Sequence, residues 1–585
     1  MLSVRVDDPR VQSSHEGGRP DALAASPGTL NPTIADAAVA TGAAGDAPGA
    51  LGADVGPAAG FRWDLAVKVA VVVALAAALV LRFWTPSALW LDEALTVDIA
   101  RAPLDQIPGL LRDDGAPPLY YYMLHFWMDL FGQGNLAVRS LAGVLGVINI
   151  PVAWLTGYRV GARSWAQDAM SPIQLEEARR RGRATAWAVT LLVASSPFVI
   201  YYDTEARMYG LVILLGTLAI LAFLSLLRNP TAWKALGLAV VLSAALYSHY
   251  WVLYSAVVGG AGTAWCAWRG PYQRACRYAL GAFVLAGLSF LPWVPTFWFQ
   301  IHHTGTPWAA PAQLTAVVFA VTQFAGGDSD SGRGLAVLFF FLAVLAIFGA
   351  PLDRWRVVLD LRTRPGVRAI GLAVVASLVL GPIAGRISGT TFADRYTAMV
   401  AFPALVCMAY GLVAIGNSRI RNGILAFAVV LGFLSAVPNA FLARTGAGVV
   451  GNLISTQATT GDVVAFCPDQ LGPAVSRVLG GRYQEITFPR DTSPEIVDWV
   501  NYVSVVHKAN PDVFASLIEA MAGRTHTVWY VWAPGYAGFG SKCQDIAADL
   551  QRWPGHRGSA AANTLSSDTP FEIYEGESLD RFRPR

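Results

Sequence analysis

Charged residues are scarce in this chain. Of its 585 residues only 14% are Asp, Glu, Lys or Arg, whereas 54% are hydrophobic and the mean hydropathy is +0.44. Soluble domains carry about 25% charged residues, so roughly half of the usual ionic content is missing. The nineteen Trp and nineteen Tyr fit many helix ends anchored at a lipid interface. The composition therefore indicates a polytopic membrane protein rather than a soluble enzyme.

Cysteine is also scarce, and its spacing argues against a zinc site. The chain has five Cys, of which Cys266 and Cys276 are too loosely spaced for a zinc clip. Cys467 and Cys543 could meet in the C-terminal segment, and a disulfide is possible there if that segment lies outside the cytoplasm. A Gly-rich phosphate loop after a strand is missing too, so no nucleotide-binding fold is expected.

The first 60 residues lack any periodic apolar pattern. They are rich in Ala, Gly, Pro, Asp and Ser, and cannot bury enough surface to offset the entropy of ordering. We therefore predict a disordered cytoplasmic tail over residues 1–60. A short cleavable apolar core near the start is absent, so this segment is not a secretory signal.

Long apolar segments fill residues 61–444, the predicted transmembrane domain. A bilayer crossing needs about 20 apolar residues. The segment Leu119–Phe131 is too short for that and is predicted as an interfacial helix inside a first outer loop, residues 85–136. About eleven crossings are predicted, near residues 65–83, 137–157, 185–201, 210–227, 235–248, 251–268, 278–298, 334–350, 369–385, 397–415 and 423–443.

The distribution of arginine and lysine predicts the orientation. Loops that face the cytoplasm carry an excess of these residues. With the N-terminus inside, the inner loops hold a dense set: Arg159, Arg163, Arg179, Arg180, Arg181, Arg183, Arg228, Lys234, Arg269, Arg274, Arg277, Arg354, Arg356, Arg362, Arg364, Arg368, Arg419 and Arg421. The outer side keeps only scattered ones: Arg82, Arg101, Arg112, Arg139, Arg207, Arg333, Arg386 and Arg395. We expect a multi-pass plasma-membrane protein with its C-terminus outside.

Residues 445–585 have the composition of a soluble domain. Residues 461–466 and 527–532 are predicted as buried strands, and 511–522 and 541–552 as helices. The alternation of strand and helix indicates a small extracytoplasmic α/β domain. It contains no recognisable catalytic constellation, and we expect a role in packing or acceptor contact.

Unusual polar residues gather on the outer side once this topology is drawn. Unpaired charge beside a membrane is costly and is therefore often functional. Acids, arginines and aromatics near a common cavity are typical of a binding site. The candidates are Asp92, Glu93, Asp113, Asp114, Glu205, Arg207, Tyr209, His249, Arg386, Arg395 and Tyr396.

Each candidate also has a purely structural interpretation. Asp92 and Glu93 suit the first turn of a helix, where the dipole favours acids. Glu205 and Arg207 could form a structural ion pair. Arg395 could simply extend its charged end to the membrane–water interface. His249 could be a satisfied interfacial histidine. Asp328-Ser329-Asp330 is expected to be a solvated turn, because an isolated DxD is weak evidence for a metal.

Taken together, the motifs resemble the GT-C membrane glycosyltransferases, in particular bacterial relatives of protein O-mannosyltransferases and of the lipid A aminoarabinose transferase. The resemblance covers about residues 60–415. It departs from the family at Gly115-Ala116, where relatives often have a His before Pro-Pro. The matching pieces are Leu91-Asp92-Glu93, Asp113-Asp114 with Pro117-Pro118-Leu119-Tyr120-Tyr121, Glu205-Ala206-Arg207-Met208-Tyr209, Leu291-Pro292-Trp293 and Arg395-Tyr396.

The resemblance implies transfer of a sugar from a polyprenyl-phosphate donor on the outer face. Asp92 is the expected base, with Glu93 next, and a single base with direct displacement implies inversion at the anomeric carbon. Arginines would stabilise the leaving phosphate: Arg207, Arg395 and, in reserve, Arg386. Asp113 or Asp114 and Glu205 would orient the sugar or the acceptor, and Tyr209, His249 and Tyr396 would line the substrate site.

The sugar and the acceptor stay open at this point. Mannose is the first expectation and arabinose the second, on resemblance alone. The acceptor could be a protein, a glycolipid or a wall glycan. No cofactor is expected, and a divalent metal is possible but not indicated. The alternatives are a flippase for a polyprenyl-linked glycan, a ligase that uses a diphosphate-linked donor, and an inactive envelope scaffold. A flippase would more often show mid-span charges and inverted repeats, and neither is evident.

Overall fold

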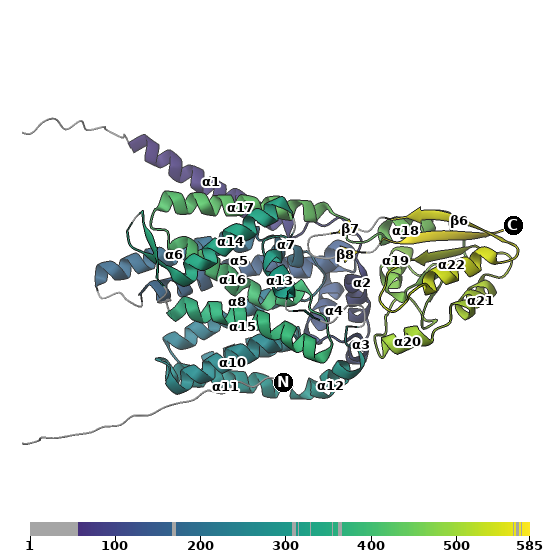
Figure 1. The fold of residues 1–585 in the computed structure, drawn as a ribbon, viewed down its shortest axis with the longest axis horizontal. Coiled ribbons are helices and arrows are strands. Elements are labelled where there is room, and N and C mark those ends of the chain that lie inside the picture. Colours follow the sequence, from purple (N-terminus) through teal and green to yellow (C-terminus); the bar gives the residue numbers. More distant parts are fainter. Residues whose placement is uncertain are drawn as a thin grey trace, which may run out of the picture. The chain divides into compact units, whose positions relative to one another are not determined.

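The apolar segments fold into a helical bundle, and the C-terminal segment folds into a sheet domain (Figure 1). The computed structural model describes residues 57–585 except 167–170, 307–311, 314, 328, 354, 361–364, 565–566, 569–572 and 575. Trp63–Arg585 form one unit, which contains the bundle and the sheet domain. Residues 1–56, most of the predicted tail, lie outside the described residues. Residues 57–60, also predicted as tail, are helical and open the first helix.

The bundle helices follow the predicted apolar segments. In chain order they are α1 (Pro57–Leu81), α5 (Asn135–Ala166), α6 (Pro172–Ser195), α7 (Pro197–Asp203), α8 (Tyr209–Arg228), α9 (Ala232–Leu246), α10 (Val252–Arg269), α11 (Gln273–Phe290), η1 (Leu291–Trp293), α12 (Val294–His303), α13 (Ala316–Gln323), α14 (Asp330–Phe348), α15 (Pro365–Ser388), η2 (Asp394–Thr397), α16 (Ala398–Val413) and α17 (Ser418–Phe441). A short hairpin, β1 (Gly349–Pro351) with β2 (Val357–Leu359), follows α14.

Seven helices in the described part of the chain are long and apolar enough to cross a membrane. The bent pair α6 and α7 would make an eighth, and Leu65–Leu81 and Ala232–Leu246 are shorter apolar helices. Each of the eleven apolar segments of the sequence coincides with helix, while the number of actual crossings stays a prediction. The fold class, a mainly helical membrane protein with a C-terminal sheet domain, is confirmed.

The predicted crossing 185–201 is broken in the structure. The axes of α6 and α7 differ by 57°. Ser196 lies between them in extended conformation, and its side chain accepts a hydrogen bond from the Val199 amide as the cap of α7. Pro197 then occupies the first turn of α7, where a missing amide proton is tolerated. The Ser-Pro pair therefore ends one helix and starts the next, which carries the chain to Asp203.

Three helices lie in loop 85–136. They are α2 (Leu91–Ala100), α3 (Ile107–Asp114) and α4 (Leu119–Phe131), and α4 has the bounds predicted from the sequence. One side of α4 is buried through Tyr120, Tyr121 and Leu124, while Leu130 and Phe131 are exposed. This one-sided burial fits a helix that lies at a membrane surface.

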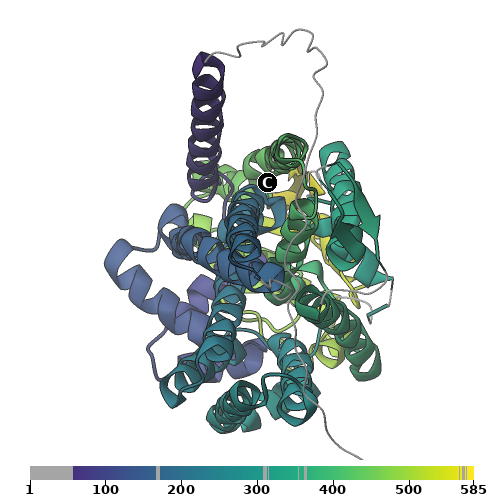
Figure 2. The same ribbon diagram turned by 90° about the vertical axis from the view of Figure 1, so that its left-hand side faces the viewer.

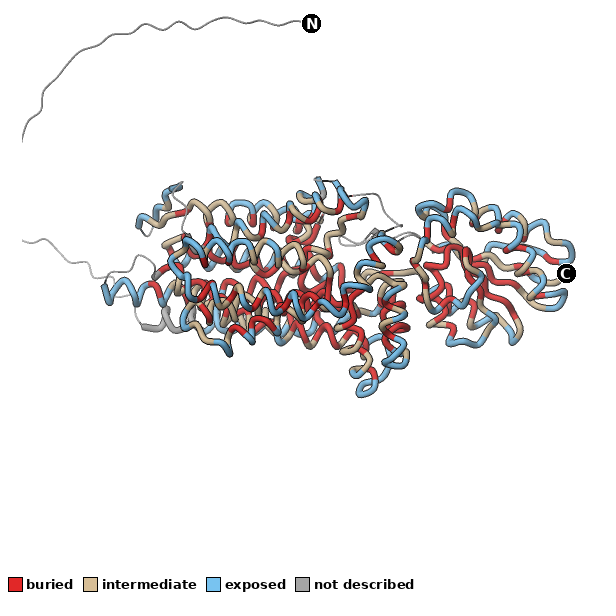
Figure 3. The backbone as a smooth tube through the Cα atoms, turned by 90° about the horizontal axis from the view of Figure 1, so that it is seen from below, coloured by how far each residue is buried: buried red, intermediate tan, exposed pale blue. Residues whose placement is uncertain are grey.

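The outer helices of the bundle expose large apolar side chains. Figure 2 shows many of the helices nearly end-on, and Figure 3 shows buried residues in the interior and exposed residues along the outer sides. On α14, Phe340 and Phe341 are about two-thirds exposed, and Phe427 and Leu434 of α17 are similarly open. An apolar surface of this extent needs an apolar solvent, and lipid supplies it.

The C-terminal domain is built on a mixed five-stranded sheet in the order β4-β3-β5-β9-β6. Central strand β3 is buried at every position and runs parallel to β4 and β5, while β9 runs antiparallel to β5 and β6. A continuous apolar strand is typical of a centre covered on both faces. In chain order the elements are α18 (Ala447–Gln457), β3 (Val463–Cys467), η3 (Asp469–Leu471), α19 (Gly472–Leu479), β4 (Gln484–Thr487), α20 (Tyr502–Lys508), α21 (Pro511–Ala522), β5 (Val528–Trp532), α22 (Lys542–Arg552), β6 (His556–Asn563), β7 (Ser567–Asp568), β8 (Ile573–Tyr574) and β9 (Ser578–Pro584).

Both cysteine pairs considered from the sequence are joined in the structure. Cys467 at the end of β3 is bonded to Cys543 at the start of α22, which ties the central strand to a helix 76 residues later. Cys266 and Cys276, at the turn between α10 and α11, also form a disulfide, a pairing that the sequence did not predict. Cys407 is buried and unpaired.

Candidate active site

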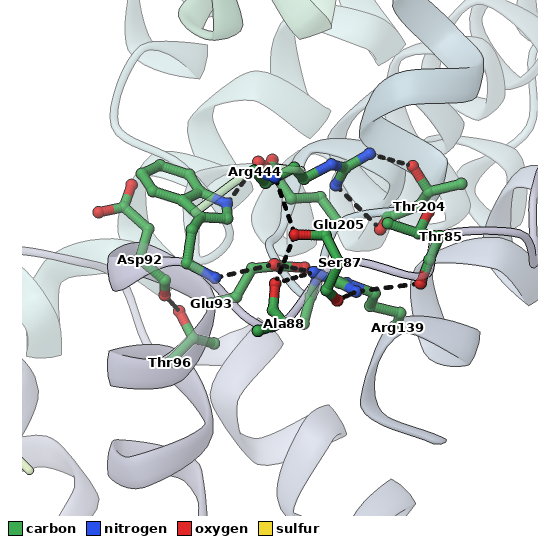
Figure 4. A network of polar contacts seen from close by, with 12 residues as sticks. Thr85, Ser87, Ala88, Asp92, Glu93, Thr96, Arg139, Thr204, Glu205 and Arg444 are labelled. Atoms are coloured by element: carbon green, nitrogen blue, oxygen red, sulfur yellow. Dashed lines mark hydrogen bonds and ion pairs between the residues drawn. The ribbon is translucent and has the colours of Figure 1, made fainter. Parts of the chain in front are cut away.

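The first turn of α2 carries the two acids that the sequence singled out. Asp92 and Glu93 follow Trp90, whose backbone amide donates to the Glu93 carboxylate at 3.4 Å. Acids are favoured there because the helix dipole is positive at its N-terminus. Successive residues of a helix point about 100° apart. The two carboxylates therefore lie in different surroundings, and Figure 4 shows Asp92 pointing away from the cluster around Glu93.

Glu93 is fully buried in an ion pair with Arg139 of α5. Arg139 Nε and Nη2 lie 2.7 Å and 2.5 Å from the two carboxylate oxygens, and the Ala206 amide donates to Glu93 Oε1 at 2.9 Å. Burial favours the neutral acid, but the Arg139 charge and these hydrogen bonds outweigh it and lower the pKa of Glu93. Its oxygens are thus occupied by structural partners. The sequence-based candidacy of Glu93 as a second base is therefore corrected: it is a buried structural acid.

Asp92 faces two arginines from distant segments. Arg207 Nη2 lies 3.5 Å from Asp92 Oδ2, and Arg395 Nη2 lies 3.7 Å from the same oxygen. The Asp92 side chain is 19% exposed. Both separations exceed the usual 2.7–3.2 Å of an N–H···O hydrogen bond, so the three groups are gathered but not locked together. The structure brings together the base candidate and the two arginines that the sequence placed opposite it.

Arg207 extends the site toward loop 85–136. Its Nη1 donates to Thr96 Oγ1 at 2.7 Å and lies 3.4 Å from the Tyr121 hydroxyl. Tyr121 in turn donates to Asp114 Oδ2 at 3.2 Å. Burial, with Asp92 nearby, raises the pKa of Asp114 to about 6 against the opposing effect of Arg207. The Asp114 carboxyl is therefore linked to Arg207 through the Tyr121 hydroxyl.

An aromatic wall flanks the arginines. His249, in the turn between α9 and α10, packs against Tyr209 at 5.6 Å and Tyr396 at 5.3 Å between ring centroids. Burial, together with Arg207 and Arg395, lowers the pKa of His249 to about 3. The imidazole is therefore neutral at physiological pH and can only donate or accept a hydrogen bond. Flat rings of this kind suit the face of a sugar.

Glu205 lies behind the site rather than in it. It is fully buried, and Trp90 Nε1 donates to its Oε1 at 3.0 Å. Arg444 braces the same turn, because its guanidinium donates to the Thr204 carbonyl and hydroxyl at 3.2 and 2.7 Å. Figure 4 shows these groups in one cluster. The prediction that Glu205 orients the sugar is corrected, since the side chain anchors the turn that presents Arg207.

The C-terminal domain reaches loop 85–136. The Trp499 amide donates to the Asp113 carbonyl at 3.2 Å, and the Asn501 amide donates to the His303 carbonyl at 2.8 Å. The half-exposed Asp113 side chain lies 3.9 Å from Arg112. Burial and the charge of Asp498 raise the pKa of Asp113. The Asp113 backbone thus contacts the sheet domain, and the side chain of Asp114 contacts Tyr121 in the Asp92 site.

Gly115 forms the turn that ends α3. It ends α3 in the left-handed conformation with φ of +99°, which glycine adopts without a steric cost. A Cβ atom there would lie 3.0 Å from Thr304 Oγ1. A side chain at position 115 would therefore be strained and would need a different loop.

Arg386 and Asp330 are exposed residues. Arg386 lies near the end of α15, and its reserve role beside the phosphate stays a prediction. Asp328 lies outside the described residues, while Ser329 caps α14 and Asp330 is exposed. Within the described ranges no three His, Cys, Asp or Glu side chains gather as metal ligands would.

Several residues of the site were not among the candidates from the sequence. Thr96 and Tyr121 hold Arg207, Arg139 neutralises Glu93, and Arg444 fixes the turn at Thr204. Arg139 had a usable signal, since a lone arginine in the first turns of an apolar helix needs a buried partner. Tyr121 lay in the Pro-Pro-Leu-Tyr-Tyr piece of the resemblance, whereas Thr96 and Arg444 gave no signal.

Comparison with solved structures shows what the fold is similar to. ArnT from Cupriavidus metallidurans in the apo state gives a TM-score of 0.55 at 14% identity, over 89% of this chain and 98% of ArnT. The same protein bound to undecaprenyl phosphate gives 0.50 at 14% identity, over 88% and 97%. The arabinofuranosyltransferase AftD from Mycobacteria gives 0.44 at 12% identity, over 88% of this chain and 40% of AftD. No family model and no curated protein matches the sequence.

The likeness to ArnT shows the fold. ArnT is a GT-C lipid A aminoarabinose transferase, and this chain shares its architecture over nearly the whole of both proteins. The resemblance predicted from the motifs is thus confirmed as the GT-C fold.

Proposed function

We propose that this protein is an inverting glycosyltransferase that moves a sugar from a polyprenyl-phosphate donor to an envelope acceptor. The observation that carries the proposal is the Asp92 carboxylate with Arg207 and Arg395 at 3.5 and 3.7 Å. The GT-C fold and the undecaprenyl phosphate bound to ArnT support the same class of donor. A lipid-linked donor reaches such a site from the bilayer, so a nucleotide-binding fold is not required.

The donor phosphate is proposed to lie between Arg207 and Arg395. Guanidinium groups bind phosphate oxygens through paired hydrogen bonds, and two of them offset the charge that develops as the phosphate leaves. Each guanidinium lies beyond hydrogen-bond distance of the Asp92 carboxylate. Thr96 holds Arg207 from behind and keeps its guanidinium in place.

The chemical step is a single displacement. An acceptor hydroxyl oxygen attacks the anomeric carbon and forms the new glycosidic bond, while the bond from that carbon to the phosphate oxygen breaks. The hydroxyl proton passes to Asp92, and the bond electrons leave with polyprenyl phosphate. The configuration at the anomeric carbon inverts because attack and departure occur on opposite faces. Asp114, Tyr121, Tyr209, His249 and Tyr396 would surround the sugar.

The reaction is proposed to need no divalent metal. Two arginines beside Asp92 already supply the positive charge that a metal would bring to a phosphate. A chelator such as EDTA should leave sugar transfer unchanged, as measured with purified protein in nanodiscs. Loss of transfer that added Mg²⁺ or Mn²⁺ restores would contradict this part of the proposal.

Asp92→Asn tests the proposal directly. The variant keeps the size of the side chain but cannot accept the proton, and removal of a general base commonly lowers the rate about 10²–10⁴-fold. The assay follows radiolabelled sugar from polyprenyl-phosphate mannose, or the arabinose donor, into envelope fractions of cells that lack the protein. Asp105→Asn removes an exposed carboxylate from the same loop and should transfer normally. Near wild-type turnover in Asp92→Asn would rule this residue out.

The choice of donor separates the remaining candidates. Mannose is our first proposal and arabinose the second, and parallel assays with the two monophosphate donors decide between them. A ligase would instead use a diphosphate-linked donor. A flippase would move the donor across vesicles without forming a new glycosidic bond. Transfer only from the diphosphate donor, or movement without transfer, would overturn the proposed reaction.

A further inference from the structure

A cavity of about 500 Å³ lies between α2 and α19, the α2–α19 cavity. This volume falls within the roughly 300–1,000 Å³ of small-molecule sites. The loop before α5 and the segment after β4 complete it. Its polar lining residues are Asp98, Arg101, Gln133, Ser476, Arg477 and Glu495.

The α2–α19 cavity is distinct from the Asp92 site although both border the same short helix. Asp92 and Asp98 are six positions apart on α2, which places them about 120° apart around the helix axis and about 9 Å along it. Asp92 faces Arg207 and Arg395, whereas Asp98 faces Arg101. Asp92 is not among the residues that line the cavity.

The charges in the cavity balance. Arg101 lies 2.9 Å from Glu495 and 3.5 Å from Asp98, and Arg477 donates to the Gln133 carbonyl. Two arginines and two acids give a formal charge of zero when both acids are ionised. A lining without net charge would attract a phosphate anion only weakly. A neutral ligand with many hydroxyls suits it, because each hydroxyl can donate to a carboxylate and accept from a guanidinium.

Asp98 offers unused hydrogen-bonding capacity. It is 6% exposed, and its separation of 3.5 Å from Arg101 Nε is longer than a normal hydrogen bond. Burial raises the pKa of Asp98 to about 7, with Arg101 and Arg477 opposing and Glu495 adding to the shift. A buried carboxyl in this state is stabilised by a ligand hydroxyl, which can act as donor or acceptor.

We propose that the α2–α19 cavity binds a short, neutral saccharide segment of the acceptor. The proposal rests on the transfer reaction proposed above, since a glycan whose reacting hydroxyl lies near Asp92 could extend around α2 to Asp98. The sequence led us to expect packing or acceptor contact from the C-terminal domain, and the proposal gives that contact a place. Its α19 and the segment at Glu495 supply one side of an acceptor site.

Binding of free oligosaccharides tests the cavity without any transfer. Saturation-transfer NMR and calorimetry would use the full chain in nanodiscs. The neutral probes are short oligosaccharides of mannose, arabinose, galactose and glucose, and the charged probes are a uronic-acid oligosaccharide and inorganic phosphate. At least one neutral probe should bind, and it should bind more tightly than either charged probe.

Two variants change the cavity in different ways. Asp98→Asn removes the carboxylate, and Gln133→Trp fills the space from an exposed position. Each should lower the affinity for the neutral probe about tenfold or more. Asp98→Asn loses hydrogen bonds to a charged group, and Gln133→Trp takes up the space that the saccharide would occupy. Asp92→Asn and Asp105→Asn should bind it as wild type does. Melting temperatures identify any variant that fails to fold, and Gln133→Trp keeps the test valid if Asp98→Asn does not fold.

Three results would overturn the proposal: no neutral probe binds, the probe binds to Asp98→Asn and Gln133→Trp as tightly as to the wild type, or phosphate binds in preference. Failure of the transfer reaction gives a different pattern. In that case Asp92→Asn transfers sugar as fast as the wild type, while saccharide binding and its dependence on Asp98 persist.

Discussion

Asp92 and Glu93 are adjacent in the sequence and have opposite surroundings. Asp92 keeps partial exposure and loose contact with two arginines, whereas Glu93 is enclosed by Arg139 and the Ala206 amide. The Asp-Glu doublet predicted a base at the start of α2 and ranked Asp92 first. It could not show that the Glu93 carboxylate is occupied by an ion pair, because the partner Arg139 lies 46 residues away in the sequence.

Protonation of Asp114 should determine how the rate of sugar transfer falls at acidic pH. Its pKa of about 6 means that the carboxyl is protonated below pH 6 and ionised above it. Only the ionised form accepts fully from Tyr121 and balances Arg207, with Asp92 and Trp499 as its other neighbours. Transfer should therefore rise with pH through about 6, with a slope approaching about tenfold per pH unit on the acid side. Rates measured from pH 5 to 8 check this.

The matched variants for this prediction are Asp114→Asn and Asp105→Asn. The first should lower the rate at pH 8 and remove the rise near pH 6, because no titratable group remains at that position. The second should keep the wild-type profile. An unchanged inflection in Asp114→Asn would assign the ionisation to another residue.

At the scale of the elements, most of the fold could be predicted. Leu119–Phe131 has the expected bounds, and the predicted strands at 461–466 and 527–532 contain most of β3 and β5. Apolar runs and turn residues are local signals, so they can be read without knowledge of the partner. The division of 185–201 into α6 and α7 was missed, although Ser196-Pro197 carried the signal for a new helix start. The clusters that join elements could not be predicted, since contacts such as Arg444 with Thr204 span 240 residues.

The Glu93–Arg139 pair should dominate the attachment of α2 to α5. Glu93→Gln leaves the Arg139 charge buried without its counter-ion, a change that costs roughly 3–5 kcal/mol in buried pairs. The variant should lose several degrees or more in melting temperature, measured by intrinsic fluorescence in nanodiscs. Asp92→Asn should melt close to wild type, because Asp92 is partly exposed and loosely paired.

An exposed acid of the same type provides the control for that prediction. Glu177 pairs with Arg181 at 2.9 Å, and about half of its side chain is exposed. Surface pairs contribute about 0–1 kcal/mol, so Glu177→Gln should change the melting temperature little. Equal stability of Glu93→Gln and Glu177→Gln would show that the buried pair does not hold α2 in place.

At the scale of the whole molecule, the C-terminal domain is joined to loop 85–136 by hydrogen bonds to backbone carbonyls and by one ion pair between side chains. Trp499 reaches the Asp113 carbonyl, Arg477 reaches the Gln133 carbonyl, and Arg101 reaches Glu495. The two contacts to carbonyls leave almost no trace in a sequence, because any residue supplies a carbonyl. The composition could identify a separate domain but not its position beside the site.

The redox states of the two cysteine pairs should report the orientation of the chain. In the N-inside topology, Arg269, Arg274 and Arg277 place the Cys266–Cys276 turn in the cytoplasm, whereas Cys467–Cys543 lies outside. The cytosol keeps thiols reduced and the exterior permits disulfides. Although Cys266 and Cys276 are joined in the structure, a cytosolic location would keep this pair reduced, so cells quenched in acid and alkylated with a maleimide polymer should show free thiols at both. Cys467 and Cys543 should be labelled only after reduction. Variants that retain a single pair, with Cys407→Ser, separate the signals. Oxidised Cys266–Cys276 or reduced Cys467 and Cys543 in intact cells would contradict the topology and place the Asp92 site on the cytoplasmic face.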